Sequence, residues 1–151
     1  MKETDRKIGE LGNRFGELAE HLVAPGIMEK FNELGFFFNE RSLDVEIRDT
    51  NNPSSATEID ILLENGDIVI AIEVKSKPKL LDIKEHIKRM DILRQRADRR
   101  GDKRKYQGAI AGAIVGQNVR QQIIKSGFYL IEQTGDTVKL SIPQGFIPKE
   151  W

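Results

Sequence analysis

The alternation of apolar and polar positions predicts a chain in which helices and strands follow one another. Apolar residues at helical spacing indicate helices, and alternating or continuous short apolar runs indicate strands. The expected elements, in chain order, are a helix at 8–22, a short helix at 26–34, strands at 43–48, 57–64 and 67–76, a helix at 80–97, a strand at 106–115, a helix at 118–125, and strands at 128–132 and 138–142.

This order predicts an α/β fold with a central mixed β-sheet flanked by helices on both sides. Strands joined by a tight turn pair antiparallel, whereas strands joined through a helix usually pair parallel. A length of 151 residues suits one domain spanning residues 1–151. The segment 49–56 is rich in Asn, Pro and Ser, which favours a turn or mobile loop that could act as a lid. We interpret the aromatic run 36–38 as core rather than as a platform for stacking bases.

Composition limits the classes of function and of metal site. The chain is 38% hydrophobic and 32% charged, and no apolar run approaches the roughly 20 residues of a membrane span. Residues 1–7 lack the features of a signal peptide, so we expect a cytoplasmic protein without membrane contact. Cysteine is absent, and His21 and His86 have no ligand spacing, so both are expected to be structural or exposed. A bound metal would therefore have oxygen ligands, which favours Mg²⁺ or Mn²⁺.

Charge is unevenly distributed although the net charge is zero. Residues 79–105 hold 11 basic and 5 acidic side chains, a local excess of six positive charges. A basic segment beside an acidic pocket suits a polyanion held near a metal, while a solvated helix and loop would explain the same pattern. The residues expected to contact nucleic-acid phosphates are Arg94, Arg96, Arg99 and Arg100.

Candidate chemistry lies on the strands at 57–64 and 67–76. Alternation places Asp60 on one face of the first strand, and Glu73 and Lys75 on the same face of the second. A two-residue turn at 65–66 would put Asp60 opposite Ala71 and make Asp60 and Glu73 diagonal neighbours, roughly 7–8 Å apart at the backbone. A divalent cation would relieve the repulsion between the acids. The alternative is an ordinary solvent-facing hairpin carrying a common Glu-x-Lys sequence.

The sequence Ile59-Asp60, the hairpin, and Glu73-Val74-Lys75 resemble the core of the PD-(D/E)xK nuclease superfamily, which includes restriction endonucleases and Holliday-junction resolvases. This resemblance implies a restriction-endonuclease-like fold and Mg²⁺- or Mn²⁺-dependent hydrolysis of phosphodiester bonds in nucleic acid, with DNA the expected substrate. It implies that Asp60 and Glu73 bind the metal together with the Val74 carbonyl. It also implies that Lys75 assists the attacking water.

The chain departs from the pattern of the superfamily at two points. Ile59 replaces the proline of the motif, and no Gln-x-x-x-Tyr signature begins at Gln95, which argues against particular branches. Rival interpretations are a catalytically inactive module that binds nucleic acid or protein on the same fold, and a purely structural domain. Since members of the superfamily often dimerise to reach both strands, a homodimer is also expected.

Many members of the superfamily supply a further glutamate from the first helix, and here Glu17 and Glu20 are the candidates. Glycines at positions 9, 12 and 16 form a stripe that suggests close packing against another element. Glu20 continues that stripe, so we favour it as the helical acid over Glu17. Both could instead be exposed helix charges. The glycines at 108, 112 and 116 are interpreted as allowing tight sheet packing rather than as a phosphate cradle.

Overall fold

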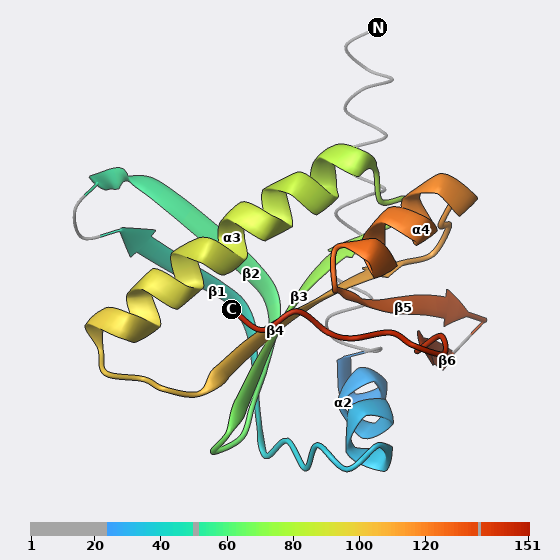
Figure 1. Ribbon diagram of the computed structural model, residues 1–151, viewed down its shortest axis with the longest axis horizontal. Coiled ribbons are helices and arrows are strands. Elements are labelled where there is room, and N and C mark those ends of the chain that lie inside the picture. Colours follow the sequence, from blue (N-terminus) through green and yellow to red (C-terminus); the bar gives the residue numbers. More distant parts are fainter. Residues whose placement is uncertain (1–23, 50–51, 136) are drawn as a thin grey trace, which may run out of the picture.

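The computed structural model describes residues 24–49, 52–135 and 137–151, which form a six-stranded mixed sheet flanked by three helices (Figure 1). Glu17, Glu20 and the rest of the expected helix at 8–22 lie outside the described residues. The elements are α2 (Ala24–Glu33), β1 (Glu40–Asp49), β2 (Asn52–Glu64), β3 (Ile68–Lys75), α3 (Leu80–Arg99), β4 (Lys105–Gly112), α4 (Gln117–Lys125), β5 (Tyr129–Thr134) and β6 (Thr137–Ser141).

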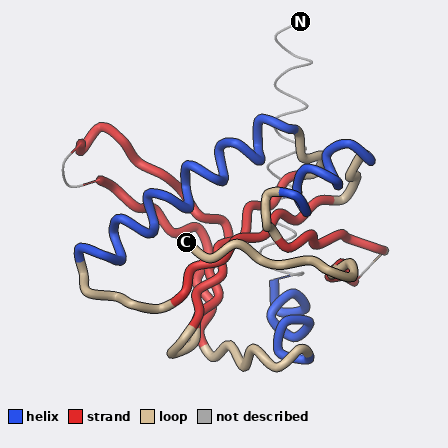
Figure 2. Tube along the Cα trace, in the orientation of Figure 1, coloured by secondary structure: helices blue, strands red, loops and turns tan. Residues whose placement is uncertain are grey.

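The strands lie in the sheet in their chain order, β1 to β6. β1, β2 and β3 pair antiparallel, β3, β4 and β5 pair parallel through α3 and α4, and β6 returns antiparallel to β5. Helices α3 and α4 lie on one side of the sheet and α2 lies on the other, as Figures 1 and 2 show. The predicted α/β order and mixed sheet are therefore confirmed for the described part of the chain.

Strand β3 is buried on both faces, which explains its almost continuous apolar sequence. On the α2 side, Ile70 and Ile72 belong to a cluster that includes Phe31. On the α3 side, Val69 and Ala71 belong to a second cluster with the apolar stripe of α3. The face that carries Glu73 is thus covered by α3, so the alternative of an ordinary solvent-facing hairpin is wrong for this strand.

Residues 52–56 form the start of β2 instead of the predicted loop or lid. In the pairing with β1, Arg48 lies opposite Ala56 and Asp49 lies opposite Asn52, after a register shift. The turn composition of this segment is overridden because β1 supplies partners for its backbone groups. The expected lid over 49–56 is therefore wrong for the described residues.

The aromatic run at 36–38 divides between the core and the surface. Phe36 and Phe38 pack around Phe31 and Tyr129 with ring centroids 5.2 to 6.0 Å apart. Phe37, in contrast, has a positive φ of 55° and is 75% exposed. The interpretation as core is confirmed for the first and third phenylalanines and is wrong for Phe37.

Two glycines of β4 allow close packing, as predicted. A Cβ atom at Gly108 would lie 2.5 Å from Cε1 of Phe128, and one at Gly112 would lie 2.7 Å from Cδ of Pro78. Gly116 differs, because a Cβ atom there would meet nothing within 4 Å. The prediction of tight packing is confirmed for Gly108 and Gly112 but not for Gly116.

Candidate metal and catalytic site

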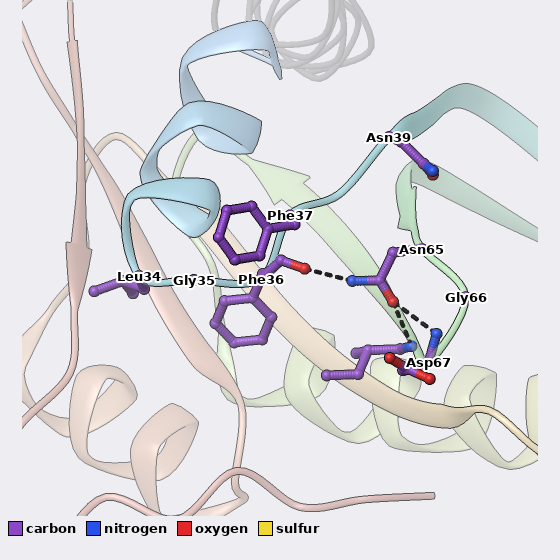
Figure 3. A pocket seen from close by; sticks show the side chains of 9 residues that line it. Leu34, Gly35, Phe36, Phe37, Asn39, Asn65, Gly66 and Asp67 are labelled. Carbon is purple, nitrogen blue, oxygen red and sulfur yellow. Dashed lines mark hydrogen bonds between the residues drawn. The ribbon is translucent and has the colours of Figure 1, made fainter.

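The turn between β2 and β3 lies one residue later than predicted, because the Asn65 N–H donates to the Ile68 carbonyl at 3.0 Å and leaves Gly66 and Asp67 between these two residues. The Asn65 Oδ1 atom accepts hydrogen bonds of 2.8 Å from the backbone N–H groups of Asp67 and Ile68. Its Nδ2 atom donates to the Phe36 carbonyl at 2.5 Å (Figure 3). The turn forms at this position because the Asn65 side chain supplies the local hydrogen bonds of a turn and ties it to the chain before β1.

Moving the turn by one residue shifts the pairing register of the hairpin by two residues. Ile61 lies opposite Ile72, so one further step along the same register places Asp60 beside Glu73. The prediction had placed Asp60 opposite Ala71, with Glu73 on the diagonal, and that register is wrong. Because side chains alternate with a period of two, the slip leaves both acids on the same face and brings them closer together.

Asp60 also takes the place of a backbone partner where β2 and β3 stop pairing. The ladder between these strands ends at Ile61 and Ile72. Beyond it, the Val74 N–H donates a 2.8 Å hydrogen bond to Oδ2 of Asp60. This bond fixes the Asp60 carboxylate against β3, next to Glu73.

Glu73 is a buried acid between two cations, with only 6% of its surface exposed. Its Oε2 atom lies 2.6 Å from Nη1 of Arg89, and its Oε1 atom lies 3.9 Å from Nζ of Lys75. Burial and then the negative charge of Asp60 raise the pKa of Glu73 to about 8, although Arg89 and Lys75 act in the opposite direction. Sequence analysis had grouped three of these four side chains, Asp60, Glu73 and Lys75, and the structure brings them together.

Arg89 of α3 is a member of the site that was not predicted from the sequence. Its Nη1 atom lies 2.8 Å from Nδ1 of His86, and its Nε atom donates to Oγ1 of Thr57 at 3.2 Å. The signal that could have found it is the polar pair His86 and Arg89, spaced i, i+3 next to the apolar stripe of α3. Even so, nothing in the sequence pairs this helix position with Glu73.

His86 is completely buried, so the expectation of a structural histidine is confirmed and that of an exposed one is wrong. Since a guanidinium group can only donate, Nδ1 of His86 accepts from Arg89. Nε2 therefore carries the proton and donates to the Ala71 carbonyl at 3.0 Å. Burial, followed by the charge of Arg89, lowers the pKa of His86 to about 3, so the ring is neutral at ordinary pH.

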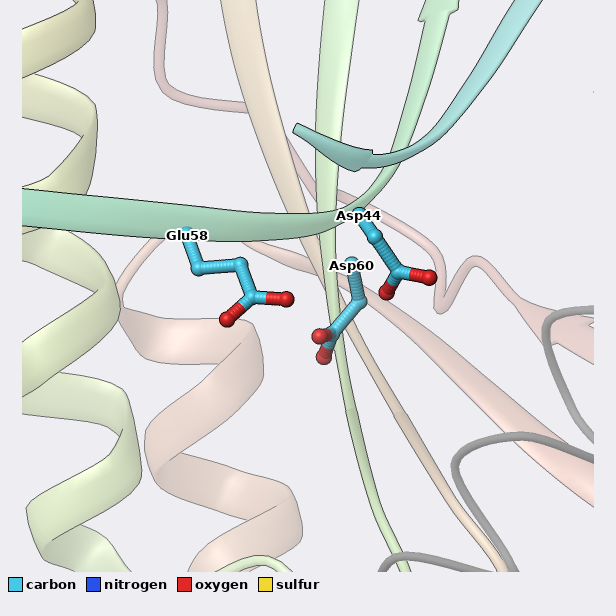
Figure 4. Close-up of side chains that lie close together, drawn as sticks. All are labelled: Asp44, Glu58 and Asp60. Carbon is cyan, nitrogen blue, oxygen red and sulfur yellow. The ribbon is translucent and has the colours of Figure 1, made fainter. Parts of the chain in front are cut away.

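A second group of carboxylates adjoins Asp60 on the β1 side. Asp44, Glu58 and Asp60 each offer an oxygen, and these three oxygens lie within 4.8 Å of one another (Figure 4). Asp44 has a positive φ of 52° and falls between residues of β1 that pair with Ile59 and Ile61 of β2, which places it opposite Asp60. Asp60 thus belongs to two neighbouring acidic groups, and such hard oxygen donors fit Mg²⁺ or Mn²⁺. The contributions of Asp44 and Glu58 were not predicted.

The four arginines expected to contact phosphates have different environments. The Nη1 atom of Arg94 donates to the carbonyls of Arg104 and Trp151 at 2.9 and 3.1 Å, and its Nη2 atom donates to that of Asp102 at 2.6 Å. Its Nε atom also donates to Asp98 at 3.0 Å. We therefore assign Arg94 a structural role in place of the predicted phosphate contact.

The other three arginines lie towards or just beyond the C-terminal end of α3. Arg96 is partly buried, whereas Arg99 and Arg100 are exposed. Arg99 follows Arg89 by ten residues of helix, which corresponds to roughly 15 Å along the axis. A phosphate bound at that end would lie well away from the acids, so these arginines remain predicted contacts for a flanking part of a long ligand.

Comparisons with protein-family models, with curated proteins and with solved structures found no match to this chain. Within the described residues, no helix is both long enough and apolar enough to cross a membrane. The chemistry of the side chains that meet beside β3 is therefore the basis for assigning a function.

Proposed function

We propose that this chain is a metal-dependent nuclease of restriction-endonuclease-like fold that hydrolyses phosphodiester bonds of nucleic acid, with DNA as its substrate. One observation carries the proposal. The Asp60 and Glu73 carboxylates lie side by side where β2 and β3 cease to pair, and Nζ of Lys75 lies 3.9 Å from Oε1 of Glu73. Two acids and an amine at the point where two inner strands separate form a set of groups suited to phosphodiester hydrolysis.

Each side chain has a distinct part in the proposed chemistry. Asp60, Glu73 and the Val74 carbonyl would hold Mg²⁺ or Mn²⁺. When bound, such an ion supplies a water of lowered pKa and neutralises charge on the phosphoryl oxygens. Lys75 is 46% exposed at its side chain, so its ammonium group can reach an incoming phosphate or orient the attacking water. Glu20 stays a predicted additional acid.

Exposed lysines beside the acids support an anionic polymer as the ligand. Lys75, Lys77 and Lys79 are all exposed and follow one another along the segment that leaves β3. Their charges would attract a nucleic-acid backbone towards the acids, which would otherwise repel it. Arg96, Arg99 and Arg100 would extend that contact along α3. A homodimer that brings two such sites to opposite strands stays part of the proposal.

The direct test is cleavage of supercoiled plasmid and of single-stranded DNA in Mg²⁺, Mn²⁺ or EDTA. We expect cleavage that requires the metal and falls by about 100-fold or more in Asp60→Asn, Glu73→Gln and Lys75→Ala. Lys125→Ala is the control for Lys75→Ala, because it removes one exposed positive charge at the end of α4, away from the site. Cleavage that persists unchanged in all three site variants would eliminate the proposed active site.

The second candidate function is a binding module that holds nucleic acid without cutting it. The observation that favours it is the 2.6 Å pair between Arg89 and Glu73, which balances the buried acid without a metal. The same assay separates the two candidates. Retention of DNA on a gel in EDTA, with no product in either metal, would support the module.

A further inference from the structure

We infer that Arg89 is a positioning residue of the proposed metal site, which holds Glu73 by Oε2 and leaves Oε1 as the oxygen available to the cation. The inference rests on the proposed function. Nη1 of Arg89 lies 2.6 Å from Oε2, while Nζ of Lys75 lies 3.9 Å from Oε1. The two oxygens of one carboxylate therefore have different surroundings.

Arg89 is held at three points, so it is a fixed partner for Glu73. Besides Glu73, its guanidinium group bonds to Nδ1 of His86 and to Oγ1 of Thr57. His86 is fixed in turn by the Ala71 carbonyl. The Arg89 side chain is only 16% exposed, and a planar fork with partners on three elements cannot rotate away without leaving several of them unpaired.

In this arrangement Arg89 and Lys75 have different roles. The ionised form of Glu73, which is the form that a cation would bind, needs a counter-charge because its side chain is 8% exposed, and Arg89 supplies it from inside the protein. Lys75 is further from Glu73 and far more exposed, so it is not required for that purpose and stays available to the substrate. With Oε2 occupied by Arg89, Glu73 would offer a cation one oxygen rather than two.

The test measures Mn²⁺ affinity by titration calorimetry on the full chain, without nucleic acid. We expect Arg89→Met to weaken Mn²⁺ binding by about tenfold or more, because the Glu73 carboxylate loses its fixed orientation. Arg89→Lys should restore part of the affinity, since an ammonium group can still bond to one oxygen. Lys88→Met is the control, because it removes a neighbouring exposed charge of α3 and should leave the affinity unchanged.

A second measurement keeps the inference testable if Arg89→Met folds poorly. In urea unfolding of the metal-free protein, the double variant Arg89→Met/Glu73→Gln should be more stable than Arg89→Met alone, because a neutral amide needs no counter-charge. A double variant no more stable than the single one would overturn the inference.

The outcomes also separate this inference from the proposed function. If the parent chain binds Mn²⁺ and Asp60→Asn abolishes binding, but Arg89→Met binds as tightly as the parent, the role of Arg89 is wrong and the metal site stands. If the parent chain binds no Mn²⁺ and cleaves no DNA, the proposed function is overturned, and the inference with it.

Discussion

Binding of a divalent cation at Asp60 and Glu73 should expel a proton from the protein at neutral pH. Burial and the charge of Asp60 raise the pKa of Glu73 to about 8 in the absence of metal. A carboxyl group with a pKa raised this far is mostly protonated at pH 7. Because the metal takes the ionised form, more than half a proton should leave for each ion bound at pH 7.

The same linkage predicts how metal affinity depends on pH. Below pH 8 the cation competes with a proton for Glu73, so the apparent affinity should rise by nearly tenfold between pH 6 and pH 7. Above pH 8 the dependence should flatten, because the carboxyl group is already ionised in the metal-free protein. A site whose acids are ionised throughout would instead show little change in affinity over this pH range.

Proton release is measured by titrating the chain with Mn²⁺ in buffers of different ionisation enthalpy. The difference in observed heat between the buffers gives the number of protons released. Glu73→Gln should release almost none, whereas Glu85→Gln, which removes an exposed acid of α3 that belongs to neither acidic group, should keep most of the release. Release below about 0.2 proton by the parent chain at pH 7 would refute the argument that burial dominates the charge state of Glu73.

Three further predictions concern stability. Gly108→Ala should lower the free energy of unfolding by about 1–3 kcal/mol in urea titrations, because its Cβ would lie 2.5 Å from the Phe128 ring. Gly116→Ala is the control and should leave the free energy of unfolding nearly unchanged, and equal effects of the two substitutions would contradict the role of close packing at Gly108. Arg94→Met should lower the free energy of unfolding by about 2–3 kcal/mol, because three backbone carbonyls lose their hydrogen-bond donor, and should leave the Mn²⁺ affinity unchanged. Weaker Mn²⁺ binding by this variant would show that Arg94 has a role at the site. The pKa of His86 is about 3 in the folded protein and 6.5 in the unfolded chain, so the unfolded chain takes up a proton first as the pH falls. The free energy of unfolding should therefore decrease as the pH drops from 6.5 towards 3, by at most about 5 kcal/mol. The variant His86→Gln should lack this part of the decrease when its free energy of unfolding is measured against pH. A pH dependence equal to that of the parent chain would contradict the prediction.

Local pattern was sufficient to predict most of the described fold and three members of the candidate site. Helical and alternating periodicity depend only on neighbouring residues, so the helices and strands could be predicted in their correct order. Alternation also placed Asp60, Glu73 and Lys75 on one face. That prediction survived an error in the turn because a slip of two residues preserves the face.

Register and the docking of helices were decided only by the tertiary structure. Asn65 fixed the position of the turn through its own hydrogen bonds, and this placed Asp60 beside Glu73. Arg89 reaches Glu73 only because α3 packs across the sheet face that carries it, and Asp44 reaches Asp60 only through the pairing of β1 with β2. Such contacts join segments far apart in the chain, and they depend on which surfaces pack together, which residue type and spacing alone do not specify.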